Sequence, residues 1–232
     1  MELDLPVLTV DEIADEAVDW PIVEHASLGR GVIQEFVRDL VRTPSGEVMT
    51  RDYLAHTGAV GVIALDEDER VLVVRQYRHP VGFRLLEPPA GLLDLDGEHW
   101  VEAAQRELAE EAGVAASDWR VLVDYMTSPG CLQETLRVYL ARGLTPCERP
   151  EGFVADGEEA HMDVVLVPLD ALVDAIYAGR VQNPTMVVGA LSAYAALRTG
   201  RVEGLRRPDA PWPARDAKHA RDAELARLRM GS

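Results

Sequence analysis

The segment from Gly91 to Val114 constrains this chain more than any other, because it reads as a glycine-opened loop that becomes a helix. We expect the helix to begin near His99, with Asp96 as its N-cap. Gly113 stands where a left-handed residue usually closes a helix. Alanines and a leucine on one side of the helix supply an apolar face, so the sequence predicts a helix packed on a sheet.

The other side of this helix carries three carboxylates. Glu107 and Glu111 lie four residues apart and Glu110 lies three after Glu107, a spacing that places them along one edge. Like charges at this spacing repel by about 0.2–0.5 kcal/mol per pair, whereas a bound cation would reverse the sign. Oxygen ligands suit Mg²⁺ or Mn²⁺, which commonly bind one or two carboxylates together with substrate phosphates. Taken alone, however, the three glutamates fit a solvated acidic face better than a metal site.

The whole segment resembles the Nudix box, which reads Gly, five residues, Glu, seven residues, then Arg-Glu-apolar-any-Glu-Glu-any-Gly-apolar. Its fixed positions are filled here by Glu98, Arg106, Glu107, Leu108, Glu110, Glu111, Gly113 and Val114. In one departure, six residues separate Gly91 from Glu98, but the extra residue lies in the loop and leaves the register of the carboxylates unchanged. So many matches in one short segment indicate a Nudix hydrolase.

Features outside the box resemble the ADP-ribose pyrophosphatase subgroup. The sequence Arg-Gln-Tyr-Arg at 75–78 and the approach Glu-Pro-Pro-Ala-Gly at 87–91 are similar to sequences of that subgroup. Pro129 lies about fifteen residues after the box, where ADP-sugar hydrolases characteristically carry a proline. Three predicted strands within 22–56 also resemble the N-terminal unit that such enzymes exchange in a homodimer. The resemblance therefore covers about 20–200.

The resemblance implies a metal ligand set and an anchor for the box. The family places Mg²⁺ or Mn²⁺ on the backbone carbonyl of Ala90 and on Glu107 and Glu111, with Glu110 as a further candidate. Arg106 usually pairs with acidic neighbours. The box-opening glutamate fits that structural role better than catalysis.

In this subgroup the general base comes from a mobile loop after the box. The loop here is 145–162, and alignment to the family's Glu-Glu pair selects Glu159 rather than Glu158. His161 stands where relatives often have an acidic residue that helps to hold a metal, so the number of metals stays open. A solvent-exposed loop charge is the alternative for Glu159.

Three further residues are candidates for substrate contacts. We expect Arg78 and Arg51 to bind the diphosphate or the base, because one guanidinium group can bind two phosphate oxygens through parallel hydrogen bonds. For Arg51 a strand-edge salt bridge is an equally simple explanation. Glu134 follows the Ser-Pro-Gly turn at 128–130, and we expect it to hydrogen-bond the hydroxyls of a terminal ribose.

Composition excludes several classes of function. The formal net charge of −17 argues against nucleic acid or an anionic membrane as the main partner. Apolar runs are shorter than a membrane span, and the acidic N-terminus does not resemble a secretion signal. Cys131 and Cys147 form no Cys-x-x-Cys pair, so neither a zinc site nor a disulfide framework is indicated, and a reducing cytoplasm fits best.

The order of predicted elements indicates an α+β or α/β fold, and the resemblance implies a Nudix-type α/β/α sandwich with a mixed sheet. We divide the chain into an N-terminal β-strand dimerisation unit at 1–57, a Nudix hydrolase domain at 58–200 and a polar tail at 201–232. The tail is expected to be disordered or to form a frayed helix at 214–229. We also expect a short helix at 10–20.

By resemblance, the activity is metal-dependent hydrolysis of ADP-ribose to AMP and ribose 5-phosphate. One alternative is hydrolysis of another nucleoside diphosphate sugar, such as GDP-mannose or ADP-glucose. Another is a non-catalytic, Nudix-derived sensor that binds ADP-ribose. The intact Glu107, Glu110 and Glu111 speak against the sensor, which has no reason to keep a metal site.

Overall fold

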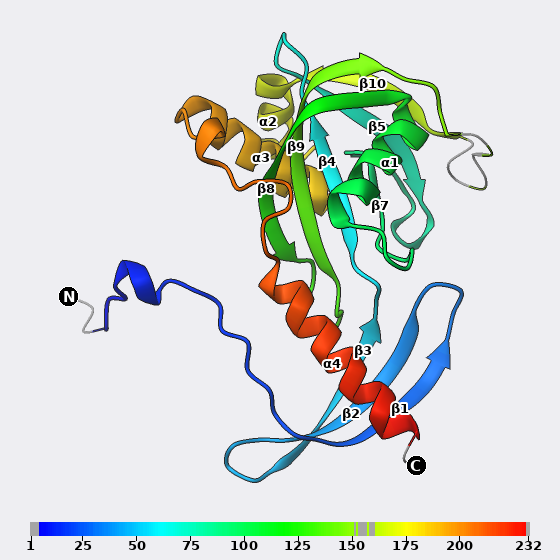
Figure 1. The fold of residues 1–232 in the computed structure, drawn as a ribbon, viewed down its shortest axis with the longest axis vertical. Coiled ribbons are helices and arrows are strands. Elements are labelled where there is room, and N and C mark those ends of the chain that lie inside the picture. Colours follow the sequence, from blue (N-terminus) through cyan, green and yellow to red (C-terminus); the bar gives the residue numbers. More distant parts are fainter. Residues whose placement is uncertain (1–4, 151, 153–156, 158–160, 231–232) are drawn as a thin grey trace.

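The computed structural model describes residues 5–150, 152, 157 and 161–230. A body of strands and helices forms the upper part of Figure 1, a three-stranded sheet lies below it, and the last helix runs down beside that sheet. Within the described residues, every helix is too short or too polar to cross a membrane.

The centre of the upper body is formed by β4 (Ala59–Ala64), β5 (Arg70–Arg78), β6 (Phe83–Glu87), β7 (Ala90–Leu92), β8 (Val114–Met126), β9 (Thr135–Pro146) and β10 (Asp163–Pro168). These strands form two sheets, one in the order β7-β4-β9-β8 and the other in the order β10-β5-β6. Only the β4–β9 pair is parallel among the described strands, so the predicted mixed topology is confirmed, although it is divided between two sheets.

Helices cover both faces of these sheets: α1 (Trp100–Ala112) on one, and α2 (Leu169–Tyr177) and α3 (Pro184–Arg198) on the other. The buried strand β4 explains this arrangement, because its side chains alternate between the faces. Val60 and Val62 pack with Leu108 of α1, whereas Ile63 packs with Met186 of α3. The result is the expected α/β/α sandwich.

The helix of the box begins at Trp100, close to the predicted start, but its N-cap differs from the predicted one. Its N-cap is His99, whose backbone N–H donates to the Glu102 carboxylate at 3.0 Å, and Asp96 is not the cap. Gly97 has a φ of 81° and turns the chain just before the helix. Since that left-handed geometry cannot continue into a helix, the cap moves beyond it. Gly113 closes the helix with a φ of 64°, as predicted.

The N-terminal sheet is antiparallel and consists of β1 (Ile22–Arg30), β2 (Glu35–Arg42) and β3 (Val48–Ala55), in that order. Ahead of it, the helix expected at 10–20 is reduced to one 3₁₀ turn, Val10–Glu12, and residues 5–20 are exposed. That segment repeats acidic side chains at helical spacing, and their mutual repulsion disfavours a helix with no packed face.

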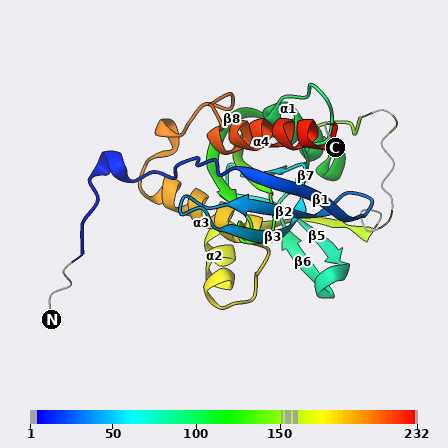
Figure 2. The ribbon, with the colours of Figure 1, turned by 90° about the horizontal axis from the view of Figure 1, so that it is seen from below.

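The C-terminal segment forms helix α4 (Pro213–Met230) in the region where either disorder or a frayed helix was expected. Short 3₁₀ turns lie at His79–Val81 and Val202–Gly204. Trp212, which precedes α4, is fully buried. Seen from below in Figure 2, α4 lies alongside the N-terminal sheet.

Candidate active site

A cleft of about 780 Å³ opens beside the loop that leads into α1. One side is acidic and comes from the box. The other side combines residues that are distant in sequence: Gln34, His56, Arg78, Thr127, Glu134 and Asn183. The cleft therefore joins the sandwich to the region between the N-terminal sheet and β4.

Arg106 organises the acidic wall. Its guanidinium donates to both carboxylate oxygens of Glu98, at 2.8 and 3.0 Å, to Glu107 Oε1 at 2.6 Å and to Glu110 Oε2 at 3.0 Å. Hydrogen bonds to Glu98, supported by the charge of Glu107, raise the pKa of Arg106 above its ordinary value. The arginine thus offsets the repulsion between neighbouring carboxylates, and Glu98 has a structural partner in this wall.

The backbone before the helix approaches the carboxylates closely. The Ala90 N–H donates to Glu111 Oε2 at 3.1 Å, and Glu111 is buried. A Cβ atom on Gly91 would collide with Cδ of Glu107, so a larger residue there would displace this side chain. The box glycine therefore allows the loop and the acidic edge of α1 to lie in contact.

The donor set of this wall fits a hard divalent cation. Glu107, Glu110 and Glu111 line the cleft beside Ala90, and all of them offer oxygen, as Mg²⁺ and Mn²⁺ prefer. Among the described residues, no three acidic, histidine or cysteine side chains form a finished ligand cluster. Arg106 instead bonds two of the glutamates, and the Ala90 N–H bonds the third.

Opposite this wall, Glu134 and His56 form a pair that faces the cleft. Glu134 accepts a hydrogen bond of 2.7 Å from Thr127 Oγ1, and its other oxygen lies 3.5 Å from His56 Nδ1. That ring nitrogen also accepts the Gly58 N–H at 3.0 Å, so it carries no proton. Burial lowers the pKa of His56, which agrees with a neutral ring.

Arg78 lines the cleft, and its guanidinium is engaged in an ion pair. It donates to both oxygens of buried Glu87, with Nη2 2.6 Å from Oε2. A guanidinium has five N–H donors, and the side chain is 43% exposed, so this ion pair orients Arg78 at the edge of the cleft.

The structure does not bring Arg51 into this cleft within one chain. Arg51 is exposed on β3, donates to the Thr50 carbonyl at 2.8 Å and borders a separate groove with Trp20 and Pro129. Glu159 and Glu158 lie outside the described residues, and His161 is exposed.

His56 is a residue of the cleft that the sequence analysis missed, as are Gln34, Thr127 and Asn183. It ends a predicted strand and belongs to no motif. The only local signal is the following Thr57-Gly58, which predicts a turn but does not predict what the histidine faces.

Comparison with known proteins identifies the family. The NUDIX domain model matches residues 55–186. ADP-ribose pyrophosphatase of Mycobacterium tuberculosis (strain ATCC 25618 / H37Rv) is 42% identical over 177 residues, which cover 76% of this chain and 84% of the relative. Methanol dehydrogenase activator of Bacillus methanolicus is 33% identical over 150 residues, covering 65% and 79%.

A solved structure described as an ADP compounds hydrolase superposes with a TM-score of 0.66 and covers 82% of this chain and 100% of its own. At 21% identity this likeness shows the fold. Together with the family match over more than half of the chain and the geometry of the box, it leads to one conclusion: the chain belongs to the Nudix hydrolase family.

Proposed function

We propose that this protein hydrolyses the diphosphate of ADP-ribose to AMP and ribose 5-phosphate. The carrying observation is the intact acidic wall, in which Glu107 and Glu111 face the cleft beside Ala90. The 42% identity to an ADP-ribose pyrophosphatase supports this substrate.

In this proposal, Ala90, Glu107, Glu111 and Glu110 hold Mg²⁺ or Mn²⁺. Such a cation neutralises the diphosphate and stabilises charge on the phosphoryl oxygens. An excess of chelator should therefore abolish turnover, and restored Mg²⁺ should recover it. Full activity in the chelator would contradict the metal assignment.

Other residues of the proposed site bind the substrate or accept the proton of the attacking water. Arg78 holds the diphosphate from the edge of the cleft, and Glu134 accepts hydrogen bonds from the hydroxyls of the terminal ribose. Glu159 accepts the proton of the attacking water as general base.

Turnover against a panel of nucleotide sugars tests the proposed substrate. We expect ADP-ribose to give AMP and ribose 5-phosphate with a higher kcat/KM than ADP-glucose or GDP-mannose. A preference for GDP-mannose would transfer the assignment to that sugar. Tight ADP-ribose binding without turnover, with Mg²⁺ or Mn²⁺ present, would identify a sensor.

We further infer that the protein is a homodimer in which β1–β3 of one chain help to complete the partner's cleft. Apolar side chains on this sheet are exposed, including Val23 at 48%, Phe36 at 43% and Val48 at 49%. An action of Arg51 on the partner's substrate would explain its distance from its own cleft.

Hybrid dimers test this arrangement. Arg51→Ala and Glu107→Gln chains, each inactive alone, should regain part of the activity when refolded together, because a hybrid contains one complete site. A protein that is strictly monomeric by light scattering and still shows full turnover would refute the exchange.

A further inference from the structure

The pair that faces the cleft lies where two neighbouring parallel strands begin. β4 and β9 run in the same direction, with Ala59 opposite Leu136, so their N-terminal ends lie side by side. His56 stands just before β4 and Glu134 just before β9. We call the place where these two N-terminal ends meet the junction. A contact that holds the junction in place therefore also holds His56 and Glu134 in their relative positions.

The side chain of Arg215, in the first turn of α4, fills the space behind the junction. Its Nη1 donates to the Thr57 carbonyl, and a Cβ atom on Gly58 would lie 2.5 Å from Nη1 and 3.0 Å from the Thr135 carbonyl oxygen. Arg215 is only 6% exposed. Its Nε and Thr135 Oγ1 are buried without a hydrogen-bond partner in the described part of the chain. A buried arginine with so few bonds is costly, which indicates a role beyond packing.

The start of α4 is itself anchored to β9. The Arg215 N–H donates to the Trp212 carbonyl at 2.9 Å, and the ring of Trp212 lies 4.7 Å from the guanidinium carbon of Arg137. Arg137 is fully buried and donates to the carbonyls of Ala210 at 2.7 Å and Pro211 at 3.0 Å. Arg137 lies three residues beyond Glu134 along the chain. Its contacts with the segment before α4 therefore fix the position of α4 relative to β9.

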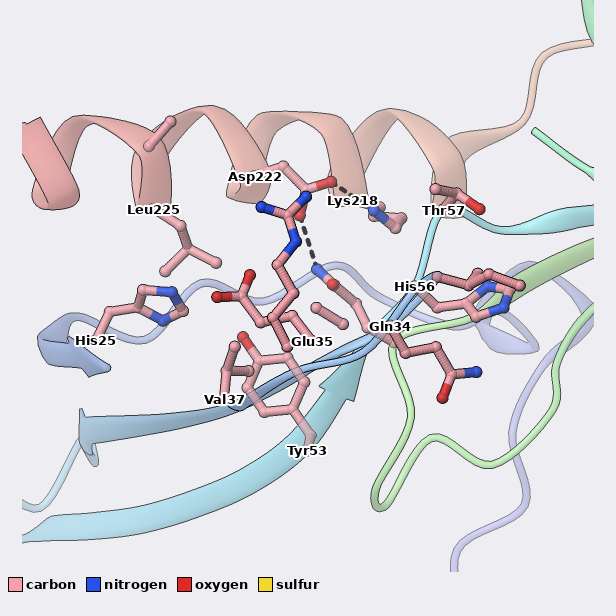
Figure 3. A pocket seen from close by; sticks show the side chains of 15 residues that line it. His25, Gln34, Glu35, Val37, Tyr53, His56, Thr57, Lys218, Asp222 and Leu225 are labelled. Carbon is pink, nitrogen blue, oxygen red and sulfur yellow. Dashed lines mark hydrogen bonds and ion pairs between the residues drawn. The ribbon is translucent and has the colours of Figure 1, made fainter. Parts of the chain in front are cut away.

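A second contact lies further along α4. Asp222 accepts a hydrogen bond of 2.9 Å from Gln133, the neighbour of Glu134, and also pairs with Lys218. Figure 3 shows Lys218 and Asp222 pointing from α4 into a pocket of about 300 Å³. His56 lines both this pocket and the cleft. Helix α4 thus contacts the His56 and Glu134 region from the side opposite the cleft.

We propose that α4 positions the His56–Glu134 pair through Arg215 and Asp222, with Arg215 as the main positioning residue. Arg215 does not line the cleft and acts through the turn at Thr57. The kinetic part of this inference rests on the proposed function, whereas its structural part does not.

Replacement of Arg215 by methionine keeps an apolar stem and removes the donors. We expect KM for ADP-ribose to rise about tenfold while kcat changes less than about twofold, because the acidic wall keeps its contacts. Arg215→Lys should recover part of the affinity. A merely structural role would lower kcat through loss of folded enzyme and leave KM unchanged. Arg227→Met, an exposed arginine on the same helix, is the matched control and should match the wild type.

Hydrogen exchange at the Gly58 amide, which donates to His56 Nδ1, provides a readout independent of substrate. Arg215→Met should accelerate this exchange about tenfold. Unchanged exchange and unchanged KM in the folded variant would overturn the proposal. If Arg215→Met does not fold, Gln133→Leu removes the second contact and should shift both quantities in the same direction, and no shift there would also overturn it. A wild type inactive on ADP-ribose would refute the proposed function and still leave the exchange test decisive.

Discussion

The two walls of the cleft are assembled in different ways. The acidic wall comes from one continuous segment, 90–111, and includes its own counter-charge in Arg106. The opposite wall brings Arg78, His56 and Glu134 together from separate segments, and each has its own hydrogen-bond partner. The first wall depends on one segment of the chain, whereas the second depends on several segments being brought together.

In our account the acidic wall serves the hydrolytic reaction, and the opposite wall serves recognition of the substrate. The acidic wall supplies the oxygen donors and stays the same whichever sugar is bound. In the proposed function the opposite wall contacts the sugar through Glu134, while its Arg78 binds the diphosphate that these substrates share. Perturbing each wall should therefore change different kinetic constants.

The largest effect is expected at Glu159, the general base in our proposal. Glu159→Gln should lower kcat by about 10²–10⁴, since a base acts in the transition state, and should leave binding of a non-hydrolysable ADP-ribose analogue nearly unchanged. Single-turnover kinetics and analogue binding separate the two steps. The neighbouring Glu158→Gln is the control and should be much milder. A large loss of kcat in Glu158→Gln would move the assignment of the general base to Glu158. Small losses in both variants would make Glu110 or His161 the next candidate for the base.

A smaller effect is expected when the support of the second wall is broken. Arg137 is fully buried and donates to both Asp124 oxygens, at 2.7 and 2.9 Å. Arg137→Met should lower the free energy of unfolding by about 3 kcal/mol, the lower end for a broken buried ion pair, because Asp124 keeps Arg206 as a second partner.

Urea denaturation of the purified variant measures this loss. Arg207→Met is the matched control, since Arg207 pairs with Asp209 on the surface with 80% of its side chain exposed, and it should cost less than about 1 kcal/mol. Equal losses in the two variants would show that the C-terminal segment adds little to the stability of this wall.

The smallest effect concerns pH. Burial lowers the pKa of His56 in the folded protein, so acidification through about 6.5 protonates the unfolded chain first and destabilises the fold. His56→Asn keeps an acceptor for the Gly58 N–H and does not titrate. Between about pH 7 and pH 5 the wild type should lose more unfolding free energy than this variant, and parallel losses would contradict the buried neutral ring.

The acidic wall could be predicted from the sequence because its geometry is local. Helical spacing alone places Glu107, Glu110 and Glu111 on one edge, and Gly113 marks where the helix ends. The predicted cap failed because Gly97 reverses the backbone immediately before the helix, a conformation that the box pattern does not encode.

The support of the opposite wall could not be predicted in this way. Arg215 and Trp212 lie in a stretch without apolar periodicity, and their burial depends on Arg137, which lies far earlier in the chain. A lone tryptophan in a polar tail was the one available signal. Glu134 could be singled out by its position after the Ser-Pro-Gly turn at 128–130, but nothing in its neighbourhood predicts that His56 lies beside it.

Kinetic comparison of Glu111→Gln with Glu134→Gln tests the division between the walls most directly. The amide introduced by Glu111→Gln can still accept the Ala90 N–H, so the variant should fold, but the lost charge should lower kcat by about 10²–10³. Glu102→Gln, in the first turn of α1, is its control. Glu134→Gln should raise KM for ADP-ribose about tenfold and leave kcat nearly unchanged. An unchanged KM in Glu134→Gln, or full kcat in Glu111→Gln, would contradict the account.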